Sequence, residues 1–209
     1  LNYSVSLYNY ANTCNDAIDQ DTITIYWGDG SSSVVSRTNG PIVGGFPAGV
    51  PVCDCRKLCI YTATHKYPGD AAYRIHIDDP ARMAGINNMI NSVGQNFYIY
   101  TTIVPNILTG TTIVTPVVTN PLACENACSG IPYYYDLGAY STIGDSLSYS
   151  LGNCLAAGGY KAVGYAIPGG VSIDPVTGIL QWISPSTPGI YNFAIDIISY
   201  RRESVAKNV

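Results

Sequence analysis

The sequence has few charged residues. Asp, Glu, Lys and Arg together make up 11% of the 209 residues, against about 25% in an ordinary soluble domain. Long helices are rich in these residues, so their scarcity argues against a helical protein. The 21 glycines, 13 prolines and 18 tyrosines instead favour β-strands joined by turns.

Basic runs and long apolar runs are also missing. The net charge is −4, and the densest basic site is the pair Arg201–Arg202. Binding to nucleic acid or to an anionic lipid surface needs clustered positive charge, which excludes both as expected partners. No uninterrupted apolar stretch reaches the roughly 18 residues needed to span a membrane, so we expect no membrane span.

The sequence offers little for catalysis. It has two histidines, His65 and His76, and no G-x-S-x-G motif that would mark a nucleophile. His65 shares strand parity with Tyr67 and is expected to pack at the corner after its strand. His76 alternates with buried-type residues and is expected to face solvent. We therefore predict that the protein is not an enzyme.

Seven cysteines are many for this length. Residues 53–59 carry three of them at C-x-C and C-x3-C spacing, without the second hook that structural zinc sites use. Disulfides are favoured over metal ligation or reduced thiols, which indicates an oxidising, extracellular location. We expect Cys14 to bond Cys53, Cys55 or Cys59, with Cys59 among the predicted bridging residues.

Alternating segments bounded by Gly, Pro and Asn predict an all-β fold of two tandem immunoglobulin-like β-sandwiches. The expected domains are residues 1–106 and 122–209, with a linker rich in Pro, Thr and Gly at 107–121. Residues 38–52 are expected to form a long loop. Residues 79–91 are readable either as the one short helix or as a loop. Strands are expected at 3–10, 21–27, 33–37, 58–67, 72–78, 97–104, 131–135, 145–151, 171–173, 179–182 and 191–200.

Two motifs in the first half carry a resemblance. Residues 26–30 read Y-W-G-D-G and residues 64–69 read T-H-K-Y-P-G. They resemble the turn and the corner of a PKD domain, an immunoglobulin-like module of extracellular proteins. The resemblance implies structural roles for the turn and corner residues, which are Trp27, Asp29, Gly30, His65 and Tyr67.

The second half carries G-D-S-L-S-Y-S-L at 144–151, I-D-P-V-T-G-I-L-Q-W at 173–182 and P-G-I-Y at 188–191. These motifs resemble Ig-like and cadherin-like modules of bacterial surface proteins, with Asp174 and Gly178 as structural turn residues. The order of motifs along the chain is similar to large proteins that gliding Bacteroidetes export by type IX secretion. In such relatives a cysteine pair at the matching positions implies a bridge between Cys128 and Cys154.

Calcium is the one cofactor that this resemblance raises. Relatives carry an acidic D-P-D-G-D turn before the S-L-S-Y strand, whereas here only Asp145 keeps a carboxylate. Calcium needs six to eight oxygen ligands, several of them carboxylates. Asp29 and Asp174 are read as turn residues. The adjacent pair Asp78–Asp79 supplies too few carboxylates to bind calcium without help from backbone carbonyls. No cofactor is therefore expected, with calcium as the less favoured alternative.

Two functional classes remain. The first is an extracellular structural or adhesive module, such as a stalk or filament segment, whose partners are other domains, copies of itself or surface polysaccharide. The second is a carbohydrate-binding accessory module of a secreted hydrolase, which an exposed coplanar row of aromatic rings would favour. Tyr133, Tyr134 and Tyr135 are read as edge or interface packing rather than as a sugar platform, with at least one ring facing away from the core.

The ends of the sequence lie close to expected strands. Relatives place a full closing strand after residues 191–200, and little of one remains here. An unpaired sandwich edge attracts another strand. We therefore expect a segment of a longer polypeptide or, less favoured, a filament subunit completed by a neighbour's strand.

Overall fold

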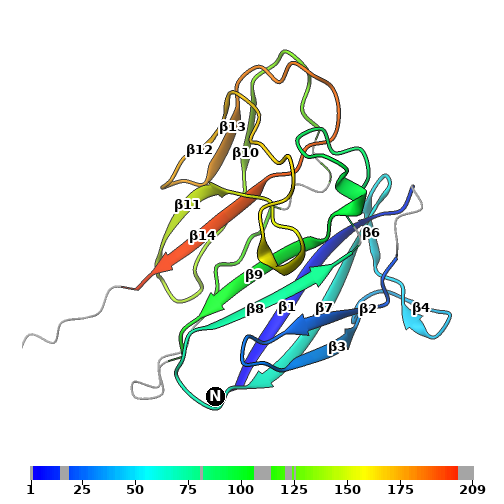
Figure 1. Ribbon diagram of the computed structural model, residues 1–209, viewed down its shortest axis with the longest axis vertical. Coiled ribbons are helices and arrows are strands. Elements are labelled where there is room, and N and C mark those ends of the chain that lie inside the picture. Colours follow the sequence, from blue (N-terminus) through cyan, green and yellow to red (C-terminus); the bar gives the residue numbers. More distant parts are fainter. Residues whose placement is uncertain are drawn as a thin grey trace, which may run out of the picture.

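The computed structural model describes residues 2–14, 19–80, 82–105, 114–120, 124 and 126–201. In this part of the chain the regular structure is β-strand, with short 3-10 turns at Ser92–Gly94 and Ala157–Gly159 and no α-helix. The strands form two sandwiches that lie against each other (Figure 1). The all-β prediction is confirmed. Of residues 79–91, Asp79 ends a strand and the described residues from 80 onward form a loop and not a helix.

The first sandwich contains two antiparallel sheets. One has the order β1-β7-β6 and consists of β1 (Asn2–Asn12), β7 (Arg56–Lys66) and β6 (Val50–Cys53). The other has the order β3-β2-β8-β9 and consists of β3 (Ser32–Ser36), β2 (Thr22–Tyr26), β8 (Tyr73–Asp79) and β9 (Phe97–Ile103). β1 and β9 are thus edge strands of their sheets.

The core of the first sandwich follows the strand alternation. Ile23, Ile25, Ile75 and Ile77 point inward from β2 and β8, and Tyr61 faces them from β7. Residues at every second strand position share one face, which is why the alternation in the sequence locates this core correctly.

The segment expected to be one long loop, residues 38–52, is more ordered than predicted. It holds a small hairpin of β4 (Ile42–Val43) and β5 (Phe46–Pro47), and its end forms β6. β6 returns onto β7 through a tight turn in which Cys55 has a φ of 60°. Only two residues separate β6 from β7, so the sequence does not mark where one strand ends and the next begins. For this reason the sequence predicts a loop where β6 lies.

The second sandwich is smaller. A three-stranded sheet of order β10-β13-β12 contains β10 (Tyr133–Asp136), β13 (Ile179–Trp182) and β12 (Val171–Ile173). β11 (Ser146–Gly152) and β14 (Ala194–Tyr200) pair as a two-stranded sheet. Leu180, Trp182 and Tyr149 are the buried side chains at its centre.

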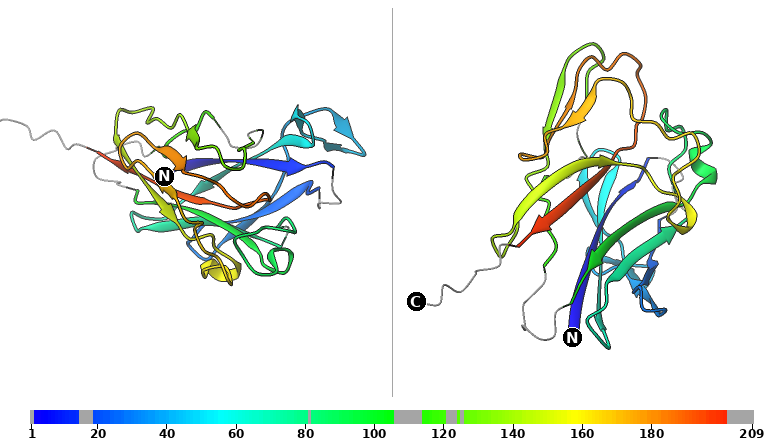
Figure 2. Two further views of the ribbon diagram at one scale, coloured as in Figure 1. Left: turned by 90° about the horizontal axis from the view of Figure 1, so that it is seen from above. Right: turned by 60° about the vertical axis from the view of Figure 1, so that its left-hand side comes forward.

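A third core joins the two sandwiches. Ile86 and Met89, from the loop between β8 and β9, pack with Cys154, Ala162 and Tyr165 of the second half. A parallel bridge between Ile86 and Ile190 extends the contact. The right-hand view of Figure 2 shows the two sandwiches next to each other. The β8–β9 loop thus belongs to a core shared by both halves.

Hydrogen bonds also connect the two sandwiches across this contact, which is called the seam below and is formed by the loop between β8 and β9 and the second half of the chain. Asn88 is 8% exposed, and its Nδ2 donates to the carbonyls of Ala166 (3.1 Å) and Asn192 (2.8 Å). Its Oδ1 accepts the Asn192 amide at 2.9 Å. Arg82, also buried, donates to the carbonyls of Asn96 and Leu155, one in each half. Buried polar groups are stable only when paired, so these contacts hold the halves in one relative position.

The disulfides differ from the predicted pattern. Cys14 bonds Cys55, one of the three partners left open, while Cys59 is a free, buried thiol. The register explains this, because Cys59 lies opposite Asn9 in the β1–β7 ladder while the Thr13 amide donates to the Cys55 carbonyl. Cys14 therefore reaches the turn and not the core position.

The bridge expected between Cys128 and Cys154 is wrong. Cys154 is a buried thiol in the shared core, and Cys128 is an exposed thiol. Cys124 instead bonds Cys53, so the second disulfide ties β6 of the first sandwich to the chain leading into the second. The resemblance implies a bridge within the second sandwich. Here Ile86 and Met89 pack against Cys154 in the shared core, whereas Cys128 lies exposed.

Candidate functional site

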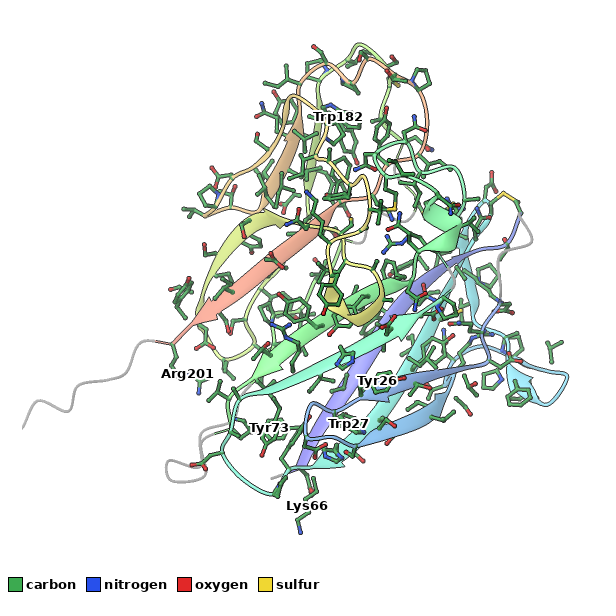
Figure 3. The ribbon with its side chains drawn as sticks, viewed as in Figure 1. Tyr26, Trp27, Lys66, Tyr73, Trp182 and Arg201 are labelled. Atoms are coloured by element: carbon green, nitrogen blue, oxygen red, sulfur yellow. A yellow bond between two sulfur atoms is a disulfide. The ribbon has the colours of Figure 1, made fainter. Side chains whose placement is uncertain are left out.

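The turn and corner motifs of the first half come together around Trp27, which is completely buried. Its indole Nε1 donates to Ser33 Oγ at 2.9 Å. His65 stacks on the indole with a centroid distance of 4.7 Å, and Tyr67 packs edge-on against His65 at 4.6 Å. The Tyr67 hydroxyl donates to the Trp27 carbonyl at 2.9 Å. Figure 3 shows where Trp27, Tyr73 and Lys66 lie at this end of the sandwich.

Asp29 closes the corner from the turn. Its Oδ1 accepts the Ser31 hydroxyl at 2.6 Å and the Ser31 amide at 3.0 Å, and its Oδ2 lies 2.7 Å from His65 Nε2. The hydrogen bonds from Ser31 and His65 lower the pKa of Asp29 to about 2. Burial raises the pKa of Tyr67 to about 12. The Asp29 carboxylate, the Trp27 indole N–H and the Tyr67 hydroxyl each have a protein partner, which is the arrangement of a structural corner.

Two glycines make the turn sterically possible. Gly28 and Gly30 have φ values of 84° and 91°. A Cβ at Gly28 would lie 2.6 Å from the Arg74 amide nitrogen, whereas one at Gly30 would meet open space. Trp27, Asp29, Gly30, His65 and Tyr67 therefore lie together as the motifs indicate. The Ser31 hydroxyl donates to Asp29 and not to His65, so this group does not assemble a serine–histidine pair.

His76 lies on the outer face of its sheet, as its parity predicts, but it is half-buried. Its ring stacks on Tyr26 of β2 at 4.8 Å and on Tyr98 of β9 at 4.9 Å. Beside it, the Arg74 guanidinium lies 4.4 Å from the centre of the Tyr100 ring. The rings form a row across three strands whose faces cover one another, so the row is not a flat platform open to a sugar.

The turn at 174–178 is also structural. Asp174 Oδ1 accepts the amides of Val176 (2.9 Å) and Thr177 (2.7 Å), and these bonds lower the pKa of the carboxyl group. Gly178 has a φ of 75°, and a Cβ there would lie 2.7 Å from the Tyr149 ring. Only glycine fits the turn without moving that ring.

The remaining acidic residues of interest are engaged by protein groups. Asp78 accepts hydrogen bonds from the Asn96 side-chain Nδ2 at 2.7 Å and from the Gly158 backbone amide at 2.8 Å. Asp79 accepts a hydrogen bond from Gln20 Nε2 at 2.8 Å. Asp145 pairs with Arg201 at 3.1 Å. Among the described residues no three His, Cys, Asp or Glu side chains form a group that could hold a metal ion.

Tyr133 and Tyr135 point to the same face of β10, with nearly parallel rings 6.4 Å apart. Their partners across the ladder are Trp182 and Leu180, both buried, so this is the inner face. Tyr134 faces the other way and is 60% exposed. The prediction that one tyrosine of the three faces away from the core is confirmed.

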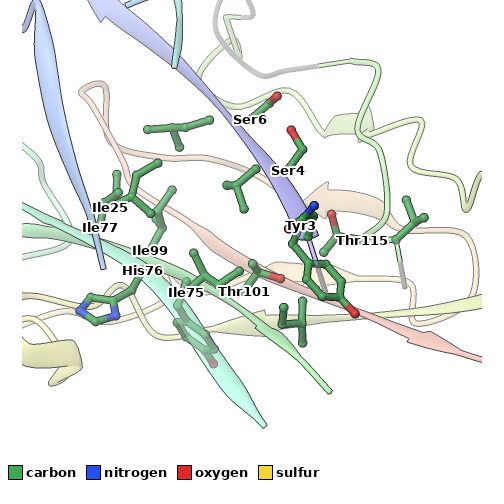
Figure 4. Close-up of a pocket in the computed structure, with 16 residues that line it drawn as sticks. Tyr3, Ser4, Ser6, Ile25, Ile75, His76, Ile77, Ile99, Thr101 and Thr115 are labelled. Carbon is green, nitrogen blue, oxygen red and sulfur yellow. The ribbon is translucent and has the colours of Figure 1, made fainter. Parts of the chain in front are cut away.

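The open side of the first sandwich forms a groove that sequence analysis did not anticipate. Tyr3, Val5 and Leu7 of β1 line one side, and side chains of β8 and β9 line the floor (Figure 4). The groove has a volume of about 580 Å³. Ile99 points inward from β9 yet remains 38% exposed. Nothing in strand periodicity reports whether a strand's inner face is covered, so the groove has no sequence signal.

Asn88 and Arg82 were also missed as contact residues between the halves. The sequence predicts either a short helix or a loop over residues 79–91, and neither interpretation indicates a contact with the second half. One feature of the sequence does indicate this role. The polar residues Asn87 and Asn88 lie between the apolar residues Ile86 and Met89, both of which are buried in the structure. A side-chain amide that lies among core residues is usually hydrogen-bonded to backbone groups. The sequence of this loop does not indicate which other segment supplies those groups.

In the described part of the chain no helix is long and apolar enough to cross a membrane. Comparison with curated proteins gives no match, and neither does comparison with solved structures. Residues 111–207 match the family described as "Putative Ig domain". This match supports an Ig-like fold for the second sandwich.

Proposed function

We propose that this chain is a non-catalytic, extracellular structural or adhesive segment of a cell-surface or secreted protein, in which two sandwiches act as one stiff spacer. The observation that carries the proposal is the shared core, in which Asn88 of one half pairs with the backbone of the other at 2.8–3.1 Å. A spacer that transmits position or force needs such a seam, whereas sandwiches on a free linker would reorient.

The disulfides support an extracellular location. Bonds between Cys14 and Cys55 and between Cys53 and Cys124 persist in oxidising compartments and are rare in the cytosol. The Ig-like match of the second half fits the same setting. Partners of such a spacer would be neighbouring domains, copies of itself or surface polysaccharide.

Finer assignments rest on motif order alone. We infer from it that the first sandwich is PKD-like, that the second is close to cadherin-like modules, and that residues 107–121 separate them. The same order supports an origin in a large protein exported by type IX secretion in gliding Bacteroidetes. The alternative, a carbohydrate-binding accessory module of a secreted hydrolase, is less favoured, because the rings of Tyr26, His76 and Tyr98 cover one another's faces and do not form a flat stacking platform.

Electron microscopy of intact source cells, labelled with antibodies raised against residues 2–201, tests the proposal. We expect label on the outer surface or on filaments and stalks. A matched sample of permeabilised cells serves as the control. Label that appears only after permeabilisation would contradict an extracellular spacer.

A further inference from the structure

We propose that the open side of the first sandwich is an acceptor site for one β-strand donated by a polypeptide chain of a different sequence, added at the edge of β1 and lying over β9. This role goes beyond that of a spacer, because it makes the module a docking partner. It rests on three features of the groove: a missing strand position, an uncharged lining and a free backbone edge.

The two sheets of the first sandwich have unequal numbers of strands. The sheet β1-β7-β6 has three strands and the facing sheet β3-β2-β8-β9 has four. Within the described residues β1 is paired with β7 along its whole length and with no strand on its other side. The position beyond β1, over β9, is therefore empty of strand in the described part of the chain. This vacancy leaves Ile99 exposed although it points inward.

The lining of the groove restricts the side chains that can enter. Val5, Leu7, Ile75, Ile77 and Ile99 supply apolar surface, and the described residues that line the groove include no Asp, Glu, Lys or Arg. His76 is also a lining residue, but its ring lies on the outer face of the sheet between Tyr26 and Tyr98. Burying a charged residue against such a surface is strongly unfavourable. The occupant must therefore present uncharged apolar side chains inward, and since the floor is a pleated sheet, it presents them at every second position.

The backbone edge distinguishes a strand from a small apolar molecule. An edge strand exposes a row of N–H and C=O groups that only another extended backbone pairs in full. Addition of a strand supplies main-chain hydrogen bonds for affinity and alternating side chains for specificity. The groove and the β1 edge lie together, so a donated strand satisfies both at once. The occupant is thus an extended, uncharged segment of a second polypeptide.

The test uses a fluorescent peptide, Lys-Thr-Val-Thr-Val-Thr-Val-Thr-Lys, and the whole chain, with binding followed by anisotropy. We expect saturable binding that Ile99→Lys weakens by about tenfold or more, since the change places a charge on the groove floor. The matched control is Val34→Lys on β3, which is 73% exposed and outside the groove, and which should bind like the unaltered protein.

A second peptide with the same side chains but an N-methyl group on every amide tests the backbone pairing. We expect it not to bind, because it cannot donate to β1. Hydrogen exchange of the unaltered protein gives a readout that does not depend on any variant: the peptide should slow exchange of alternate β1 amides and leave β3 amides unchanged.

Three results would overturn the proposal. The first is absence of saturable binding by the unmethylated peptide. The second is equal binding of the methylated peptide, which would make the groove a simple apolar pocket. The third is self-association of the protein alone that Ile99→Lys abolishes, which would assign the groove to a second copy of this chain.

Discussion

Asp29 holds the turn and the corner of the first sandwich together through Ser31 and His65. Its pKa in the folded protein is about 2, below the value of about 3.9 for a free aspartate. The unfolded state therefore binds more protons between these values, so stability contributed by Asp29 is present above about pH 4 and is lost as the pH falls toward 2.

We therefore expect Asp29→Asn to be less stable than the unaltered protein at pH 7, with the difference shrinking as the pH falls from about 4 to about 2. Urea unfolding midpoints between pH 7 and pH 2 measure it. Asp70→Asn, at an exposed loop position, should keep the original pH curve. A difference between Asp29→Asn and the original protein that stays constant down to pH 2 would show that the carboxylate is not responsible.

Gly178 and Gly144 separate two effects of a side chain at positive φ. Both have φ values near 75–79°, but a Cβ at Gly178 meets the Tyr149 ring at 2.7 Å while one at Gly144 meets open space. Backbone strain alone costs about 1–3 kcal/mol. We expect Gly178→Ala to lower the free energy of unfolding by more than about 1 kcal/mol beyond Gly144→Ala, because the clash is added to the strain. Equal losses in thermal or urea unfolding would contradict the close contact.

The elements that carry cysteine allow a direct check of connectivity. Non-reducing peptide mapping should recover Cys14 with Cys55 and Cys53 with Cys124. Cys128 should react with iodoacetamide in the native protein, whereas the buried thiols of Cys59 and Cys154 should react after unfolding. Recovery of a peptide joining Cys128 to Cys154 would require a different packing of the shared core.

Strand by strand, the sequence predicts the fold well where side chains alternate. The segments around Ile23, Ile75 and Tyr149 were placed on strands because their period-2 pattern reports which face is buried. β6 was missed because its four residues end in a tight turn.

The corner residues Trp27 and His65 were found because their neighbours are close in sequence or part of a known motif. The role of Asn88 was not found, since its partners Ala166 and Asn192 lie 78 and 104 residues away in the sequence. The exposure of Ile99 was not found either, since it depends on the open side of the first sandwich.

At the scale of the whole molecule, the seam predicts cooperative unfolding. Asn88→Ala leaves the half-buried Asn192 amide and the carbonyls of Ala166 and Asn192 without their Asn88 partner, and each such loss costs up to about 1–3 kcal/mol. We expect the unaltered protein to unfold in one calorimetric transition and Asn88→Ala to show two. Asn39→Ala, which removes hydrogen bonds inside the first sandwich, is the control and should shift the transition without splitting it. Two transitions in the unaltered protein would mean that the halves are independent.

The shared core also has an evolutionary consequence. Ig-like modules are commonly recombined between genes one at a time, which succeeds when each module closes its own core. Here a transfer of the first sandwich alone would carry Ile86 and Met89 into solvent, and the second alone would lose the partners of Ala162 and Tyr165. Such orphaned surfaces promote aggregation. We therefore expect either sandwich, when moved alone into another protein, to need new residues that cover this apolar surface.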